Sequence, residues 1–416
     1  MKSRQFQRGV GALSASVLLL LIMTVVVFYA NRNVIFEQRS AISQARNTQA
    51  FEVAEAGMEW VIGMLNTPTE VDGNCVANSS GTRFRVTYLA PNITTFAPTN
   101  GVPGCKMING AWSCKCPSGT STNLSATSGP SFTASFAAVA GYTNVVQVTV
   151  TGCTENTGTG VCAATGTGAP DGTAVITAQL KVSPLLPARA PAPIVCGGNC
   201  AIGGSFSVIN QSVETNGILV NAGGTITSGN GTSYTTLPGQ PAQNALVGSD
   251  SSLSSLASSD ATCSNSSMFR TFFGTTIEEY KNQPQVKTIS CGSANDCSSQ
   301  IQTAYAAGDR NFYFSSDVHL SGNVTLNNVS NPVVFVTPNG LTINGNWTIY
   351  GVIFSNSSDF NDIGTGNSSI YGAIVSCNAY NNNGNGLVSY NEDVFGNINI
   401  LGGTLVKIPG SWKDWN

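Results

Sequence analysis

The sequence predicts an α+β protein: a long N-terminal helix, transmembrane and then amphipathic, packs on an antiparallel β domain, and a C-terminal parallel β-helix-like (solenoid) domain follows. Three observations predict this fold class. An uncharged, mostly apolar run covers residues 10–30 and continues as a helical pattern to residue 66. Apolar and polar residues alternate in several segments of residues 67–183. A 21-residue repeat lies near the C-terminus.

The apolar run from Val10 to Ala30 is long enough to cross the hydrocarbon core of a bilayer as a helix. A cleavable secretory signal has a shorter apolar core followed by a small-residue cleavage site, whereas this run continues into further helix. Lys2, Arg4 and Arg8 precede the run and favour a cytoplasmic N-terminus. We therefore expect one membrane span.

The helical pattern extends through residues 31–66, and the first proline after the run is Pro68. Apolar side chains recur there at three- and four-residue spacing and form one stripe. The stripe consists of Phe51, Ala54, Met58, Val61 and Leu65. A continuous helix over residues 10–65 would be about 84 Å long at ~1.5 Å per residue. We expect its outer half to pack on the globular domain and its inner half to be buried in lipid or against copies of itself.

Residues 67–183 are predicted to form a disulfide-bearing β-rich domain. Alternation predicts strands at residues 83–89, 145–151 and, in part, 174–182. Antiparallel strands that follow a long helix would bury its outer half. Prolines then crowd residues 184–194, which indicates an extended linker and a domain boundary.

Residues 195–416 are predicted to form the β-helix-like domain. Residues 346–356 align with residues 367–377, with six of eleven positions identical, and an earlier copy is looser. Short apolar strands with Gly/Asn turns at this period predict one coil per repeat, with Gly351 and Gly372 at the corners. Residues 197–227 would supply the first coils. A helical insertion is expected at about residues 228–320, with helices around 267–280 and 297–307.

Twelve cysteines in a chain with 9% charged residues indicate an oxidising compartment. Local disulfides are feasible between Cys153 and Cys162, Cys196 and Cys200, and Cys291 and Cys297, although spacing does not decide the connectivity. Zinc-type spacing is not repeated and His319 is the only histidine. We expect structural disulfides, no metal and no cofactor.

The charge pattern disfavours nucleic-acid binding and catalysis. The net charge is −3, and no basic block follows the first eight residues. Glycan-acting enzymes with β-helices need grouped carboxylates, but no acidic pair recurs at the repeat period. Asp359 and Asp362 lie in an Asn/Ser-rich loop and are only a weak calcium candidate. We expect a protein that is not an enzyme.

Three aromatic residues of the repeat, Trp347, Tyr350 and Tyr371, have two readings. They could form an exposed ladder that contacts a surface glycan or a protein. The favoured reading is that they cap stacked coils, because apolar side chains on repeats usually stack.

The N-terminal segment resembles that of PilX-type minor pilins of type IV pilus systems. The resemblance rests on the basic residues before Arg8-Gly9, on the apolar run, and on Ala50-Phe-Glu-Val-Ala-Glu-Ala-Gly-Met-Glu59. It implies that residues 1–9 are a prepilin leader, removed by a prepilin peptidase after Gly9, and that the new terminus, Val10, is N-methylated. Large PilX-type proteins commonly end in a β-helix-like domain, so the resemblance covers both ends of the chain.

One position departs from the pilin pattern. Most pilins have glutamate at the fifth mature position, where it pairs with the terminal amine of a neighbouring subunit, but this chain has Ser14. An unpaired charge in an apolar bundle is costly, and a subunit with no neighbour ahead has no amine to neutralise. The serine therefore predicts a tip-proximal subunit.

The sequence thus predicts a minor pilin-like structural subunit that primes assembly, contributes to adhesion, or both. Its expected partners are other major and minor pilins, the prepilin peptidase and the inner membrane. As a precursor it would span the inner membrane once with a periplasmic C-terminus, and it would then lie in the pilus at the cell surface. The alternative is a membrane-tethered adhesin-like module outside any filament, and a glycan-acting enzyme is more remote.

Overall fold

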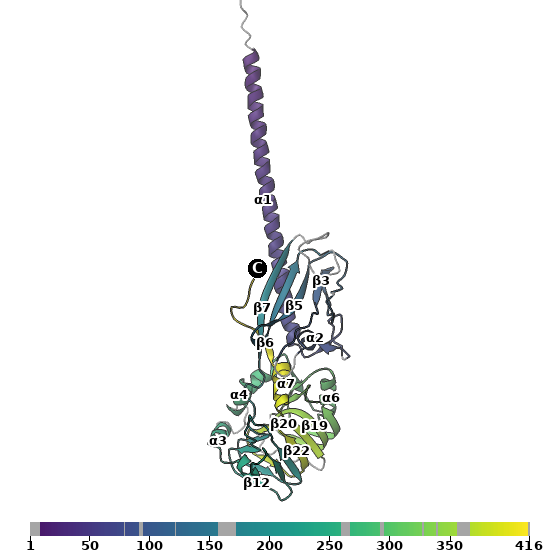
Figure 1. Ribbon diagram of the computed structural model, residues 1–416. Coiled ribbons are helices and arrows are strands. Elements are labelled where there is room, and N and C mark those ends of the chain that lie inside the picture. The colour runs from purple at the N-terminus through teal and green to yellow at the C-terminus, as the bar shows by residue number, and fades with distance from the viewer. Residues whose placement is uncertain are drawn as a thin grey trace, which may run out of the picture.

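The computed structural model describes residues 9–78, 80–90, 95–120, 122–156, 172–258, 267–291, 295–326, 328–337, 340–355 and 367–414. Within them, a long helix leads into an antiparallel sheet, and a stack of parallel strands lies at the opposite end of the molecule (Figure 1). The predicted α+β order, an apolar helix followed by β-rich structure, is confirmed.

Helix α1 (Gly9–Asn66) is continuous, and protein covers only its C-terminal part, which is shorter than the predicted outer half. The described side chains of residues 11–49 are exposed, and burial begins at Ala50. The predicted apolar stripe is confirmed for Ala54, Met58, Val61 and Leu65, which are at most 1% exposed. Phe51 is half-buried.

The outer half of α1 packs against an antiparallel sheet with the strand order β23-β7-β6-β5-β3-β4. Apolar residues of β5, β6 and β7 share one core with the stripe of α1. The strands are β3 (Gly104–Ile108), β4 (Ala111–Lys115), β5 (Ser131–Val139), β6 (Tyr142–Cys153), β7 (Thr173–Ser183) and β23 (Thr404–Lys407). A short antiparallel pair, β1 (Glu70–Val71) and β2 (Thr82–Arg83), lies beside the end of α1.

Two glycines allow α1 to lie close to this sheet. A Cβ on Gly152 of β6 would be 2.5 Å from the Ala50 carbonyl oxygen and 2.5 Å from the Ala54 nitrogen. A Cβ on Gly57 would be 2.6 Å from the Phe132 ring. Helix and strand backbones therefore approach through small residues, as tight packing requires.

The strand predicted at residues 83–89 is wrong beyond Arg83, because helix α2 (Phe84–Leu89) forms there. In a strand, Phe84, Val86 and Tyr88 would share one face, yet Val86 is 37% exposed while Phe84 and Tyr88 are buried. Helical spacing instead brings Phe84 and Tyr88 together, with ring centroids 4.4 Å apart. The edge of the Phe84 ring then packs against Trp60 of α1.

Residues 194–389, from β8 to β22, form a second unit whose strands pair in parallel, in a 12-stranded and a 3-stranded sheet that share one core. The 12-stranded sheet has the order β13-β10-β22-β20-β19-β18-β16-β15, with β8, β11, β14 and β17 paired off this path, and the 3-stranded sheet has the order β12-β9-β21. The strands are β8 (Ile194–Cys196), β9 (Cys200–Ile202), β10 (Phe206–Ile209), β11 (Val220–Ala222), β12 (Ile226–Ser228), β13 (Ser233–Thr235), β14 (Leu246–Val247), β15 (Val286–Ile289), β16 (Asn311–Phe314), β17 (Val318–Leu326), β18 (Val333–Thr337), β19 (Leu341–Ser355), β20 (Asn367–Ser376), β21 (Tyr380–Asn382) and β22 (Asn385–Ser389).

The 21-residue repeat is confirmed as the pairing of β19 with β20. Ile349 faces Ile370 and Ile353 faces Ile374 at that offset, and all four side chains are buried in one core. Gly351 and Gly372, the predicted corner residues, are neighbours at the point where the other partner of β19 changes from β17 to β18. A Cβ on Gly372 would collide with the Gly351 carbonyl oxygen, and the φ of Gly372 is +142°.

Replacing this glycine should destabilise the second unit. We expect Gly372→Ala to cost about 2 kcal/mol or more, because strained φ and a backbone collision act together. Thermal unfolding of the full chain checks this. Gly119→Ala is the control, since its Cβ would meet nothing within 4 Å. Equal melting temperatures for both variants would contradict the corner assignment.

The predicted insertion at residues 228–320 is too broad, because β13, β14, β15 and β16 pair with the stack. Strands of two to four residues are too short to give a clear alternating pattern. The helices of this region are η1 (Ala242–Ala245), α3 (Ser251–Ser258), α4 (Ser267–Phe273), α5 (Ile277–Lys281) and α6 (Ser298–Ala306). Helices therefore form near residues 267–280, as two short pieces, and near 297–307, as expected.

The Pro-rich segment 184–194 is not a solvated linker. Leu185, Leu186 and Ala192 are buried, and α4 supplies much of the core around them. The backbone of Leu186 exchanges hydrogen bonds with the side chain of Asn399 at 2.8 and 3.0 Å. The segment is a packed connection, because its leucines and alanines share a core with α4, α7 and strands of the second unit.

The predicted domain 195–416 is wrong at its C-terminal end. Helix α7 (Glu392–Gly402) leads back toward the first sheet, and β23 adds to β7 as its edge strand (Figure 1). Asn66, at the end of α1, exchanges hydrogen bonds with the Leu405 backbone at 2.8 and 3.0 Å, and Lys407 forms an ion pair with Glu59. The parallel stack is therefore inserted between two strands of one antiparallel sheet.

Candidate functional site

The inner half of α1 is the most unusual surface of the molecule. Its side chains between residues 11 and 31 carry no charge, and large apolar residues such as Leu13, Leu20 and Phe28 are 67–73% exposed. The helix is long and apolar enough to cross a membrane. Burying each such side chain would yield roughly 1.5–3 kcal/mol. This surface therefore requires lipid or other apolar helices around it.

Polar groups within this apolar stretch are satisfied inside the helix. The Ser14 hydroxyl donates to the Gly11 carbonyl at 3.0 Å, and the Ser16 hydroxyl donates to the Ala12 carbonyl at 2.7 Å. Thr24 donates to the Leu21 carbonyl at 2.8 Å. Ser14 therefore requires no partner from another chain, unlike a carboxylate at the same position.

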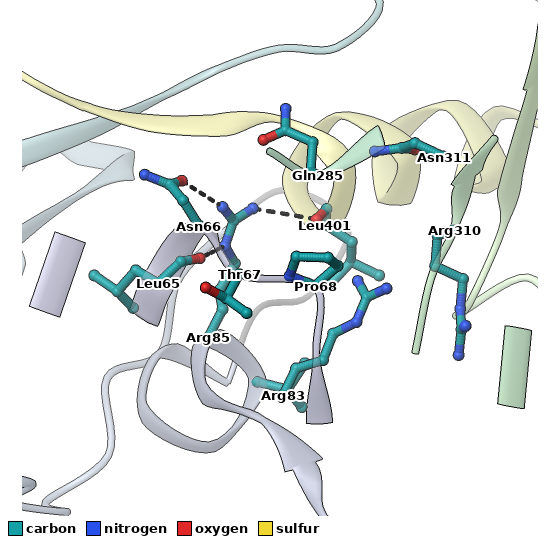
Figure 2. A pocket seen from close by; sticks show the side chains of 11 residues that line it. Leu65, Asn66, Thr67, Pro68, Arg83, Arg85, Gln285, Arg310, Asn311 and Leu401 are labelled. Atoms are coloured by element: carbon teal, nitrogen blue, oxygen red, sulfur yellow. Dashed lines mark hydrogen bonds between the residues drawn. The ribbon is translucent and has the colours of Figure 1, made fainter. Parts of the chain in front are cut away.

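A buried arginine joins α1 to the second unit. Arg85 of α2 donates to the Leu65 carbonyl at 2.8 Å and to the Asn66 side chain at 3.0 Å (Figure 2). The same guanidinium donates to the carbonyls of Ile400 and Gly403 at 2.8 Å and of Leu401 at 3.2 Å. It thus satisfies carbonyls at the C-terminal ends of both α1 and α7.

Burial lowers the pKa of Arg85 to about 10, so it remains cationic at neutral pH. The sequence analysis did not identify this residue. Its only local signal is a charged residue among the apolar positions of a short amphipathic segment. The partners lie more than 300 residues away in α7, which no local pattern reveals.

The cysteines of the described residues form disulfides, and none is free. The structure pairs Cys196 with Cys200 and Cys291 with Cys297. Cys153 is disulfide-bonded, but Cys162 lies outside the described residues. Two pairs were not singled out from the sequence: Cys105–Cys114 joins β3 to β4 within the antiparallel sheet, and Cys75–Cys116 joins residues that follow β1 and β4.

The structure describes only some of the other predicted site residues. Helix α1 begins at Gly9, next to Val10, whereas residues 1–8 lie outside the described part of the chain. Asp359 and Asp362 also lie outside it. Among the described residues, no group of three His, Cys, Asp or Glu side chains could hold a metal ion. His319 sits in β17 with its Nε2 2.7 Å from the Asn344 amide nitrogen.

The three aromatic residues of the repeat do not form an exposed ladder. Trp347 is fully buried and donates to the Ser321 carbonyl at 2.9 Å. Tyr350 and Tyr371 are half-buried and stack on each other with centroids 4.6 Å apart and an interplanar angle of 14°. Each ring hides one face against the other, which leaves little ring surface for a sugar. This favours the capping role.

The chain thus combines a long helix that is apolar and exposed at its N-terminal part with an antiparallel sheet packed on its C-terminal part. The family model described as PilX N-terminal matches residues 10–59. These residues are therefore a PilX-type pilin N-terminal segment, as the sequence resemblance indicated.

The remaining comparisons are distant. No curated protein matches the chain. An ice binding protein from an Antarctic Biological Consortium is 12% identical, with a TM-score of 0.27, over 50% of this chain and 91% of that one. The competence-associated pilin ComZ from Thermus thermophilus is 11% identical, with a TM-score of 0.22, over 88% of this chain and 97% of that one. At these TM-scores neither likeness defines the fold.

Proposed function

We propose that this chain is a non-enzymatic minor pilin-like subunit of a type IV pilus or related filament. The observation that carries the proposal is the inner half of α1, which is uncharged, apolar and exposed within a PilX-type segment. In the precursor this half spans the inner membrane, with the C-terminus in the periplasm. After assembly the same surface packs against the apolar helices of other pilins.

Processing would make the transition from membrane to filament possible. We propose that a prepilin peptidase removes residues 1–9 after Gly9 and that Val10 becomes the methylated terminus. The proposal is supported by the continuity of the helix through residues 10–66, because cleavage after Gly9 leaves this apolar segment on the mature chain.

The second unit would be a β-helix-like domain that projects from the filament. Support comes from parallel pairing in two sheets around one core, the in-register repeat and the buried isoleucine columns. Because α1 and the stack lie at opposite ends of the molecule, the stack would extend outward to contact neighbouring subunits or a surface (Figure 1). Residues 67–183 together with β23 would form the pilin-like domain.

The proposal is tested by filament content and filament number. Sheared pili should contain this protein in much smaller amounts than the major pilin, and deletion of its gene should reduce the number of surface pili. Unchanged pili, with the protein confined to the membrane fraction, would instead support a membrane-tethered binding module.

Ser14 predicts a location near the filament tip. Gold-labelled antibodies against a C-terminal tag should bind at the filament ends. Ser14→Glu should spread the label along the shaft, because the new carboxylate can neutralise the amine of a subunit ahead. Ser16→Ala is the control and should leave labelling at the ends. Uniform labelling of wild-type filaments would exclude the tip location.

A further inference from the structure

A small cavity lies where the end of α1, β2 and α2 meet α7 and the start of β16, and three arginines contribute to its wall. Arg83 comes from β2, Arg85 from α2, and Arg310 from the residue before β16 (Figure 2). Gln285 and Asn311 add further side-chain amides. The cavity volume is about 10 Å³, which is room for one guest of about the size of a water molecule.

Two donors at this cavity are buried without a partner. Arg85 uses its N–H groups on carbonyls and Asn66, but the Nη2 of Arg83 and the Nε of Arg310 have no hydrogen-bond partner among the described residues. The Nη1 of Arg310 donates to the carbonyls of Tyr305 and Asp309 at 2.7 Å. An unsatisfied buried donor costs about 1–3 kcal/mol.

The charges at this junction do not balance. Three guanidinium groups face two carboxylates: Glu70, the cross-strand neighbour of Arg83, and Asp309. No ion pair joins these groups in the described part of the chain, and the exposed Lys287 also acts on Asp309. Burial, with repulsion from Arg310 and Arg85, lowers the pKa of Arg83 to about 9. Apart from the exposed Lys287, the three guanidinium groups exceed the two carboxylates by one positive charge, and Arg310 also lies over the Tyr305 ring at 3.8 Å.

We propose that the cavity binds one monatomic anion, chloride in ordinary buffers, held by Arg83 and Arg310 between the two units. A water molecule would accept hydrogen bonds from the free N–H groups but would leave the buried positive charge unbalanced. At low dielectric constant an unbalanced charge costs more free energy than an unpaired N–H group. Phosphate, sulfate and carboxylates are too large for a guest volume of this size. The inference does not depend on assembly into a filament.

The test is thermal unfolding of the full chain in detergent at constant ionic strength, with chloride replaced stepwise by gluconate. We expect chloride and bromide to raise the melting temperature saturably, by about 3 °C, because a ligand that binds only the folded state stabilises it. Arg83→Gln should abolish this dependence. Arg270→Gln, on the exposed side of α4, should retain it.

Bromide in crystals of the wild-type protein gives a second test that needs no variant. The expected result is an anomalous peak in the cavity within contact distance of the Arg83 Nη2. A water molecule there with no anomalous signal, peaks at the surface only, or a melting shift that Arg83→Gln retains would each overturn the proposal.

Discussion

Replacing Arg85 with leucine should lower the stability of the full chain by about 3 kcal/mol or more. The variant would remove the donor to four buried or part-buried carbonyls and to the Asn66 side chain. Buried acceptors that lose their donor cost about 1–3 kcal/mol each, and losses of this size are diagnostic of broken buried networks. The contact between α1 and α7 should unfold before the rest of the protein.

Thermal unfolding and limited proteolysis measure this effect. We expect the melting temperature of Arg85→Leu to fall by at least about 5 °C and cleavage between α7 and β23 to accelerate. Arg85→Lys keeps the charge but loses the planar set of N–H donors. Its melting temperature should therefore lie between those of the wild-type protein and Arg85→Leu. Arg270→Leu, at an exposed position, is the matched control. If Arg85→Leu melted like the wild-type protein, Arg85 would not stabilise the junction between α1 and α7.

The second large effect is expected where α1 meets the sheet. Gly57→Leu should destabilise the protein by about 3 kcal/mol, because its side chain would have to displace Phe132 and Val150. Gly63→Leu in the same helix is the matched control. A Cβ at Gly63 meets nothing within 4 Å, so there the helix gains propensity without a collision.

The two glycine variants should therefore differ in sign. Denaturant unfolding of both variants, followed by tryptophan fluorescence, to which Trp60 in the helix–sheet core contributes, measures the difference. If the two stabilities were equal, the close approach of helix and sheet would not be a property of the folded protein in solution.

The sequence was most informative where a pattern repeats along the chain. The helical period of α1 and the 21-residue offset between Ile349 and Ile370 both express contacts that recur regularly, so the residues themselves carry the signal. Helix α2 was missed because Phe84, Val86 and Tyr88 fit a strand as well as one short helical segment. Six residues are too few to distinguish the two periods.

The rest depends on contacts between distant parts of the chain. Nothing in Thr404–Lys407 indicates that this strand joins β7, more than 200 residues earlier. The partners of Arg85 in α7 and the pairing of Cys75 with Cys116 are of the same kind. The candidate packing surface of α1 was predictable, because its apolar composition is local. The junction that holds the two units together was not.

The most direct test of the proposed function is the N-terminal mass of the protein purified from cells that assemble pili. The account predicts a mature chain that begins at Val10 and carries a methyl group on its terminal amine, with residues 1–9 absent. Gly9→Leu should block this processing and retain the chain in the membrane. An intact Met1 on the wild-type protein from piliated cells would contradict the assignment as a pilin-like subunit.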